Sequence, residues 1–356
     1  MSAQNTPSGA AMFTGLVDLA AAGLGGRVLA VSDDFFATKD NLLQQARPVF
    51  RPDEYTDRGK WMDGWESRRR RTPGHDWAIV KLGAPGVIRG LDIDTSFFLG
   101  NHPPYASIEA IVAEPNADAE ALAKRQDWVE ILEQVPLRPG SQNMFAVSHA
   151  PGWPKSWTHL RLHIYPDGGV ARLRVYGVVD PDFTEVDADD EVKPILQVGE
   201  IDLAAVKNGG LALACSDMFF GPMNNLFLPG RAENMGGGWE TRRRRGPGFD
   251  WMVLRLGAPG TIGMLEIDTA HFKGNCPDRC SVEAIHSPRA RLTELVHPEA
   301  AWRGVLPETA LTPHTRHFFR EEVLHPGPFT HVRLSIYPDG GMSRFRVWGR
   351  RAESRR

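Results

Sequence analysis

Apolar and polar residues alternate along much of the chain with a period of two residues. In 160–164, leucine or isoleucine occupies every second position, and arginine or histidine lies between them. The alternation resumes in 171–175, after the segment 166–169, which reads Pro-Asp-Gly-Gly. Two alternating runs around an Asp-Gly-Gly turn predict a β-hairpin with one buried face.

Further strands are predicted at 76–82, which Gly83 stops, and at 87–94. Glycine and proline interrupt the chain about every ten residues, a spacing typical of β-sandwiches. The helical signal is weak: the best candidate is 117–131, with a fainter counterpart at 298–305. We therefore predict an all-β protein of antiparallel jelly-roll sandwiches with a short helix.

The second half of the chain repeats the first. Matched segments occur in the same order, and the clearest are 32–36 with 216–220, 64–71 with 238–245 and 165–169 with 337–341. A repeat this long is a whole domain rather than a solenoid unit. We predict tandem domains at 1–183 and 184–356. The joining segment 180–194 holds seven acidic residues and two prolines, a composition that suits a solvated linker.

Composition narrows the classes of function. The length of 356 residues allows two domains of ordinary size, and the formal net charge of -3 disfavours a general nucleic-acid binder. Because the sequence has no apolar stretch of about 18 residues, we expect no membrane partner. Three cysteines make a poor disulfide framework, so a cytoplasmic location is the simplest expectation.

We expect neither a metal nor a cofactor. Cys276 and Cys280 lack a second ligand pair at zinc spacing, and His314 and His317 stand alone. The sequence also lacks a Gly-x-Ser-x-Gly nucleophile motif and a phosphate-binding P-loop.

The most specific chemical signal is Gly-Trp-Glu-Ser/Thr followed by four arginines, which occurs in both repeats. If 68–71 enters a strand, its side chains alternate between two faces, and unpaired guanidinium groups cannot be buried on both. One pair should then reach solvent or a pocket while the other finds carboxylates or an interface. Arginine suits a two-pronged hydrogen bond to a carboxylate, but a solvated charge run is an equal alternative.

Carboxylates flank the arginine runs in both repeats. Those that could act as acids, bases or hydrogen-bond acceptors are Glu66, Asp76, Asp94, Glu109, Glu240, Asp250, Asp268 and Glu283. For any one of them alone, an ion pair with arginine or a turn cap is the favoured interpretation.

Three histidines of the first repeat are replaced in the second: His75 by Phe249, His102 by Cys276 and His163 by Ser335. Histidine is most often the general acid near neutral pH. Either the first repeat holds the working pocket, or these histidines are incidental. Other histidines are private to the second repeat, so the count leaves both interpretations open.

Taken together, several segments resemble allantoicase. They are 31–36, 59–71, 75–77 and 92–95, with Phe98, Gly100 and Asn101. The resemblance spans nearly the whole chain and includes its duplication. It implies two jelly-roll, galactose-binding-like repeats and the hydrolysis of allantoate to (S)-ureidoglycolate and urea during purine breakdown. One departure is Gly237, which stands where the first repeat has Asp63, so a pocket that needs this acid would be degraded in the second repeat.

The expected reaction gives the candidate residues their roles. His75 or Glu66 would protonate the departing urea, and Asp76 would activate water. We expect the substrate to be bound by Asp33, Arg68, Arg69, Arg70, Asp94, Glu109, Glu240 and Arg242. The alternatives are a hydrolase of a related ureide such as ureidoglycolate and a non-catalytic ligand-binding sandwich. We expect a homo-oligomer whose partner is a small-molecule substrate.

Overall fold

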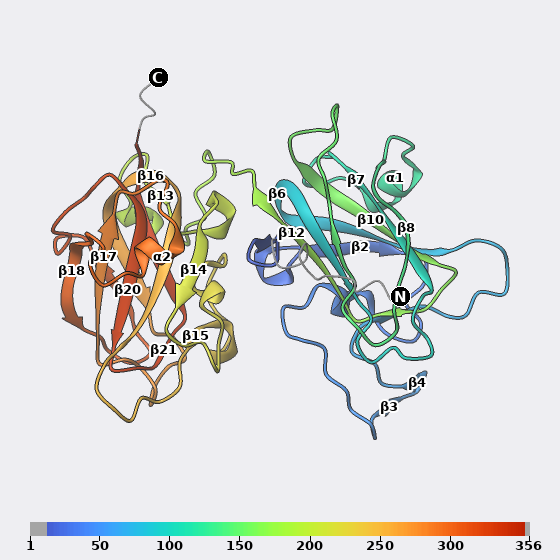
Figure 1. Ribbon diagram of the computed structural model, residues 1–356, viewed down its shortest axis with the longest axis horizontal. Helices are drawn as coiled ribbons and strands as arrows, with labels where there is room; N and C mark the ends of the chain where they lie inside the picture. The colour runs from blue at the N-terminus through green and yellow to red at the C-terminus, as the bar shows by residue number, and fades with distance from the viewer. Residues whose placement is uncertain (1–12, 353–356) are drawn as a thin grey trace, which may run out of the picture. The chain divides into compact units, whose positions relative to one another are not determined.

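The computed structural model describes residues 13–352. The chain divides into two compact units, of which the first ends at Asp180 and the second begins at Pro181 (Figure 1). The sequence predicts this boundary slightly later, after residue 183. Each unit contains an eight-stranded antiparallel sheet, and the strand order matches between the two units.

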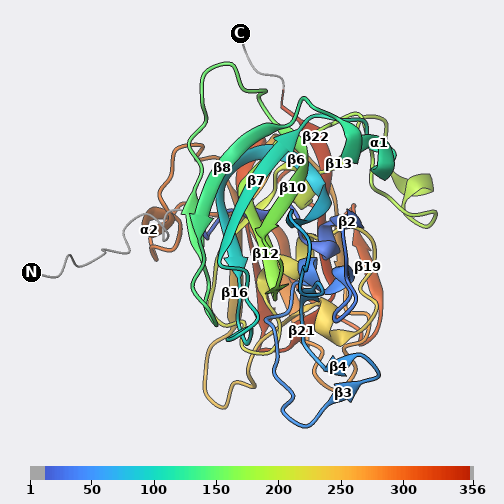
Figure 2. The same cartoon turned by 90° about the vertical axis from the view of Figure 1, so that its right-hand side faces the viewer.

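The first unit is almost entirely β-structure. Its strands are β1 (Val17–Asp18), β2 (Arg27–Val31), β3 (Tyr55–Thr56), β4 (Gly59–Lys60), β5 (Trp65–Glu66), β6 (Asp76–Asp94), β7 (Tyr105–Ile111), β8 (Val129–Pro136), β9 (Met144–Ala146), β10 (Trp157–Tyr165), β11 (Gly169–Val170) and β12 (Arg172–Val179), with helix α1 (Ala119–Lys124). The main sheet runs β1-β12-β6-β10-β7-β8, and β2 and β9 also pair with β6. Figure 2 shows β8, β7 and β10 side by side.

The second unit repeats this plan. Its strands are β13 (Ile201–Asp202), β14 (Leu211–Cys215), β15 (Trp239–Glu240), β16 (Asp250–Asp268), β17 (Arg279–Ile285), β18 (Arg303–Ala310), β19 (Arg316–Phe319), β20 (Phe329–Tyr337), β21 (Gly341–Met342) and β22 (Arg344–Arg351), with helix α2 (Leu292–Leu295). The sheet runs β13-β22-β16-β20-β17-β18. Across the described residues, no helix is long and apolar enough to cross a membrane.

The two predicted strands at 76–82 and 87–94 form the single strand β6. Its first half pairs with β2 and β10, and its second half pairs with β9 and β12. Gly83 therefore does not end the strand. A Cβ atom there would lie 2.8 Å from the backbone of Leu24 and Gly26, so the glycine permits a close approach of two segments.

The predicted hairpin at 160–175 is wrong. β10 and β12, which the short strand β11 separates along the chain, pair with different halves of β6 instead of with each other. The turn between them instead meets the segment that follows β5. Ser67 donates its backbone N–H to the Gly168 carbonyl at 3.2 Å, and Arg70 donates its own to Asp167 Oδ2 at 2.8 Å.

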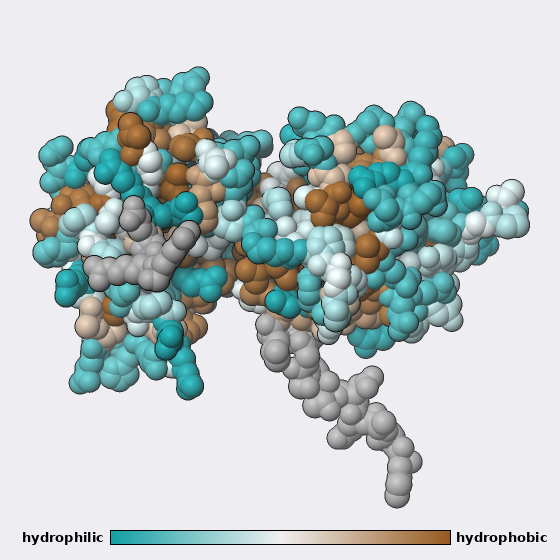
Figure 3. All heavy atoms as spheres, turned by 90° about the horizontal axis from the view of Figure 1, so that it is seen from above, coloured by the Kyte–Doolittle hydropathy of each residue, from teal (hydrophilic) through white to brown (hydrophobic). Residues whose placement is uncertain are grey.

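The alternation that predicts the strands also marks the buried face. Leu160, Leu162 and Ile164 are each 0 % exposed, while Arg161 and His163 between them are half-buried. Full burial of such a side chain stabilises the fold by about 1.5–3 kcal/mol. Hydrophilic residues cover most of the face of each unit that Figure 3 shows, interrupted by smaller apolar areas. The all-β class predicted from the sequence is confirmed.

The helix predictions are largely wrong. Only 119–124 of the segment 117–131 is helical, capped by Asp118, whose Oδ2 accepts from the Ala121 N–H at 2.8 Å. The chain then enters β8. In the second unit, 298–305 contains no helical residue, because α2 ends at Leu295 and β18 begins at Arg303.

The acidic segment between the repeats is not a free linker. Val192 is fully buried against Met264 and Trp348 of the second unit. Asp189 and Glu191 both pair with Arg316 Nη1, at 2.8 and 2.9 Å. The predicted linker is therefore solvated along most of its length, but Val192 and the two ion pairs attach it to the second unit.

Candidate active site

The arginine run of the first repeat forms a loop after β5. Arg68 donates its backbone N–H to Asp33 Oδ1 at 2.8 Å, and the N–H of Arg70 goes to Asp167. Because carboxylates take these backbone donors, no strand partner is needed. Residues 68–71 do not enter a strand, yet Arg68 and Arg70 do find carboxylates, while Arg69 and Arg71 are exposed.

Asp76 is the buried centre of this cluster, with only 1 % of its surface exposed. Its Oδ1 accepts hydrogen bonds from Arg70 Nη1 at 2.6 Å and from Ser32 Oγ at 2.9 Å. Asp76 Oδ2 and Arg70 Nε are buried and have no hydrogen-bond partner among the described residues. A buried polar atom without a partner is costly, so each of these atoms is suited to meet a ligand or a water molecule.

Two histidines and a glutamate form a chain of hydrogen bonds beside this pair. His75 Nε2 lies 2.8 Å from His163 Nδ1, and His163 Nε2 lies 2.8 Å from Glu109 Oε2. Arg161 donates from Nε to the same Glu109 oxygen at 2.7 Å. The His75 ring also packs on Tyr165, with 4.6 Å between the ring centroids.

The pKa shifts of these three residues determine which nitrogen atoms of the hydrogen-bond chain carry protons. Burial raises the pKa of Glu109, but hydrogen bonds from His163 and Arg161 outweigh it and hold the pKa below its usual value. Burial lowers the pKa of His163, and burial together with the charge of Arg70 lowers that of His75. With neutral rings, His163 donates to Glu109 and accepts from His75 Nε2–H. His75 Nδ1 is then left as a free proton acceptor.

Glu66 has a different environment from Glu109. It ends β5, pairs with Gly169 of β11, and accepts a hydrogen bond from Asn101 Nδ2 at 2.7 Å. Burial raises the pKa of Glu66, and the Asn101 bond only partly offsets this effect. Glu66 therefore keeps its proton to a higher pH than an exposed glutamate, a property that suits a general acid.

Two members of this arrangement are not among the site residues predicted from the sequence, although the sequence analysis names both. Asn101 positions Glu66, and His163 links His75 to Glu109. The absence of His163 from the second repeat was the available signal. Its contact with His75 depends on the register of β10 against β6, which pairs His163 with Trp77, the second residue after His75.

The second repeat keeps the carboxylate and arginine framework but lacks the histidine chain. Glu240 accepts from Asn275 Nδ2 at 2.6 Å, Arg242 Nε donates to Asp217 at 3.1 Å, and Arg244 pairs with Asp250. The predicted residues Glu240 and Arg242 thus reproduce Glu66 and Arg68.

Phe249 and Ser335 stand where the first repeat has its two imidazoles. Phe249 packs on Tyr337 with 4.9 Å between ring centroids, and Glu283 accepts a 2.8 Å hydrogen bond from Arg333 Nε. No imidazole relay therefore forms at this place in the described part of the second unit.

A family model described as the allantoicase repeat matches residues 17–180 and 201–352. The chain belongs to the allantoicase family. A probable allantoicase of Pseudomonas aeruginosa (strain LESB58) is 46% identical over 351 residues, covering 98% of this chain and 99% of that protein. A probable allantoicase of Burkholderia mallei is 48% identical over 333 residues, covering 94% of each.

A solved structure leads to the same family. The crystal structure of allantoicase from Saccharomyces cerevisiae is 36% identical, covers 97% of this chain and 98% of that one, and superimposes with a TM-score of 0.78. The resemblance inferred from the sequence and the tandem all-β repeats are both confirmed.

Two acids of this allantoicase-family chain lie apart from the cluster. Asp94 Oδ1 accepts from the Ser96 backbone at 2.7 Å, and the described residues give it no hydrogen bond to the arginine run. Asp63 instead holds the buried Arg172, with both carboxylate oxygens 2.9 Å from Arg172 Nη2. Asp63 is therefore a structural ion-pair partner, and its loss from the second repeat says nothing of a substrate pocket there.

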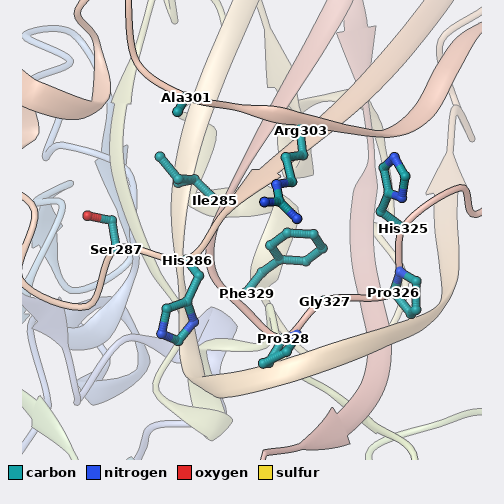
Figure 4. A pocket seen from close by; sticks show the side chains of 10 residues that line it. All are labelled: Ile285, His286, Ser287, Ala301, Arg303, His325, Pro326, Gly327, Pro328 and Phe329. Carbon is teal, nitrogen blue, oxygen red and sulfur yellow. The ribbon is translucent and has the colours of Figure 1, made fainter.

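A cavity of about 590 Å³ opens in the second unit of this family member (Figure 4). Its lining includes Arg303, His286, His325 and Phe329, and none of the residues that the sequence predicts for the site. It lies where β17 ends and β20 begins. The arginine run of this repeat meets the turn after the other end of β20, where Asp339 accepts from the Arg244 N–H at 2.8 Å. In neither unit do the described residues contain a group of three or more His, Cys, Asp or Glu placed to hold a metal ion.

Proposed function

We infer that the protein hydrolyses allantoate to ureidoglycolate and urea, and we propose that the reaction occurs in the first repeat. Membership of the allantoicase family supports the reaction. The observation that carries the location is the His75–His163–Glu109 chain beside the Arg70–Asp76 pair. The second repeat keeps the pair and lacks the chain.

Allantoate presents one carboxylate and two ureido groups on a single carbon atom. Arg70 has N–H groups beyond the one that binds Asp76, and the exposed Arg69 is close in sequence, so these two are suited to hold the carboxylate. Asp76 Oδ2 is an acceptor for a ureido N–H. Fixing both ends of the substrate holds the scissile C–N bond against the acid and the base.

Loss of urea requires a proton on the departing nitrogen and a hydroxyl group on the carbon. We assign the acid role to Glu66 because burial raises its pKa, and the base role to His75 Nδ1 because burial and the charge of Arg70 lower the pKa of His75. Breaking the C–N bond with help from the remaining ureido nitrogen gives an imine. Because the remaining ureido nitrogen keeps its own proton, this imine is protonated, and water adds to it while His75 takes a proton from the water. Transfer of that proton from His75 back to Glu66 through solvent restores both groups, and the sum of the steps is allantoate plus water to ureidoglycolate plus urea.

Glu109 supports this base through His163. When His75 accepts a proton, its positive charge is stabilised by a relay that ends on an ionised carboxylate, the arrangement that orients the histidine of catalytic triads. Arg161 and Tyr165 hold the two ends of the relay in place. Glu109 therefore has a positioning role in this proposal and does not contact the substrate.

Glu109→Gln should shift the pH profile of the reaction. The base is active above the pKa of His75, so kcat/KM falls as the pH drops through that value. Because the charge of Glu109 raises the pKa of His75, its removal lowers that pKa further and moves the acid limb of the kcat/KM profile to lower pH. The maximal kcat falls by less than the roughly 10²–10⁴-fold contribution of the base itself.

The matched control is Glu283→Gln, which changes the corresponding carboxylate of the second repeat and should leave the profile unchanged. An acid limb that stays in place in Glu109→Gln would remove Glu109 and His163 from the mechanism.

Urea release tests the reaction. The purified full chain should release urea from allantoate, and the rate should exceed that on ureidoglycolate, the substrate of the alternative ureide hydrolase. Binding of allantoate without urea release would support the non-catalytic alternative and overturn the proposal. The cytoplasmic location and assembly into a homo-oligomer stay predictions, and light scattering of the purified chain tests the second.

A further inference from the structure

A buried arginine occurs at the equivalent position of each repeat, but the two arginines have different hydrogen-bond partners. In the first, Arg172 is 1 % exposed and its Nη2 contacts both oxygens of Asp63 at 2.9 Å. The rest of its guanidinium meets backbone carbonyls: Nε donates to Ala46 at 3.0 Å, and Nη1 donates to Asp63 at 3.1 Å and Ala171 at 2.7 Å. Every side of this cation is satisfied.

In the second repeat, Arg344 has the same backbone partners but no carboxylate. Its Nε donates to Gly230 at 2.8 Å, and its Nη1 donates to Gly237 at 2.8 Å and to Ser343 at 2.7 Å. Gly237, at the end of the 3-10 helix η7 (Met235–Gly237), stands where the first repeat has Asp63. Arg344 Nη2 makes no hydrogen bond to any described residue, although the side chain belongs to a residue only 5 % exposed.

The neighbouring charges do not replace the missing aspartate. Asp268, beside Arg344 in the sheet, accepts from the Ala270 N–H at 2.8 Å and lies 3.5 Å from Arg231 Nη2. Burial and the charge of Arg346 lower the pKa of Arg344 to about 10, and Asp268 only partly opposes them. A buried cation without an anionic partner is costly to the fold, so the site favours an added anion.

A cavity of about 120 Å³ lies beside this arginine. Its lining includes Arg344, Arg346 and Arg231, together with the acids Asp187, Asp189 and Glu266. Of these acids, Asp189 and Glu266 are both bound by Arg316, at 2.8 and 2.7 Å. A water molecule takes about 30 Å³ of liquid volume, so the space holds a few waters or one small anion.

We propose that this cavity of the second repeat binds a small monocarboxylate of the size of formate or acetate. The carboxylate binds Nη2 of Arg344, the atom that in Arg172 of the first repeat binds Asp63. The acids along the lining disfavour a more highly charged anion such as phosphate. The inference does not rest on the proposed reaction, because residues of the second repeat form this site, whereas the histidine chain belongs to the first repeat.

Acetate binding to the full chain tests the site directly. Saturation-transfer NMR on the acetate methyl protons, titrated against chloride at constant ionic strength, should give a saturable signal with the wild type. Gly237→Asp supplies the missing carboxylate from the protein itself and should weaken acetate binding roughly tenfold or more. Gly237→Ala is the steric control: its Cβ would lie 3.2 Å from Ala232 Cβ, so it should fold with a slight shift and keep the signal.

The reciprocal change is Asp63→Gly, which opens the corresponding place on Arg172. This variant should gain a second acetate site per chain, and it decides the matter even if Gly237→Asp does not fold. A wild type with no saturable signal overturns the proposal, as does Gly237→Asp that folds and binds acetate as tightly as wild type. Urea release by each variant reports separately on the reaction, so failure of one proposal leaves the other standing.

Discussion

Replacing His75 with phenylalanine, the residue of the second repeat at this position, should lower kcat for urea release by about 10²–10⁴-fold. His75 Nδ1 is the free end of the Glu109–His163–His75 relay, and the charges of both Arg70 and Asp76 act on the pKa of His75. KM should change little, because the proposed carboxylate clamp is Arg70. Steady-state kinetics of urea release measures both constants.

The second repeat provides the control for this change. Phe249→His restores an imidazole to the equivalent position without His163 behind it, so it should leave kcat at the wild-type value. His163→Ser should lose activity but less than His75→Phe does, because His163 acts only through His75. If His75→Phe retained wild-type kcat, the base would have to be sought elsewhere, beginning with Asp76.

Much of the architecture could be predicted from the sequence because it follows from local periodicity. The alternation in 160–164 identifies a strand with one buried face, since side chains of a strand point alternately to opposite sides. The duplication identifies two equivalent units. The hairpin failed because alternation reports which face is buried and not which strand is the neighbour. A Gly-Gly turn serves equally well to carry the chain from one half of β6 to the other.

The helix predictions failed for a related reason. Residues 117–131 contain enough alanine and leucine to favour a helix, but the helix ends at Lys124. From Val129 onward, tertiary pairing with β7 overrides the local preference: Val129 pairs with Ala110, and Leu132 with Ile108.

In the candidate site, too, residues close in sequence could be grouped from the sequence, whereas residues brought together by the fold could not. Arg70, His75 and Asp76 are close in sequence, so the sequence alone is enough to group them. His163 and Asn101 are far from them along the chain, and only strand register and loop packing bring them in. The arginine run was also harder to assign, because Asp33 and Asp167 bind its backbone and hold it as a loop.

Asp76→Ala and Asp250→Ala should separate stability from catalysis. Each removes a carboxylate that is 1 % exposed and binds an arginine and a serine: Arg70 with Ser32 in the first unit, and Arg244 with Ser216 in the second. Each should therefore lower the free energy of unfolding of its own unit by about 3 kcal/mol, because a largely buried guanidinium is left without its anion. Chemical denaturation monitored by tryptophan fluorescence measures this loss.

Catalysis should respond to only one of the two variants. Asp76→Ala should reduce kcat/KM for allantoate by roughly 10²-fold or more, since Asp76 lies beside His75 and offers an acceptor to the ureido group. Asp250→Ala, measured where both proteins are folded, should keep wild-type kinetics. Equal losses of activity would mean that the second repeat also turns over substrate or that both variants act through stability. Each site has an equivalent arginine, serine and carboxylate. The difference in kcat/KM between the two variants therefore measures what the histidine chain adds.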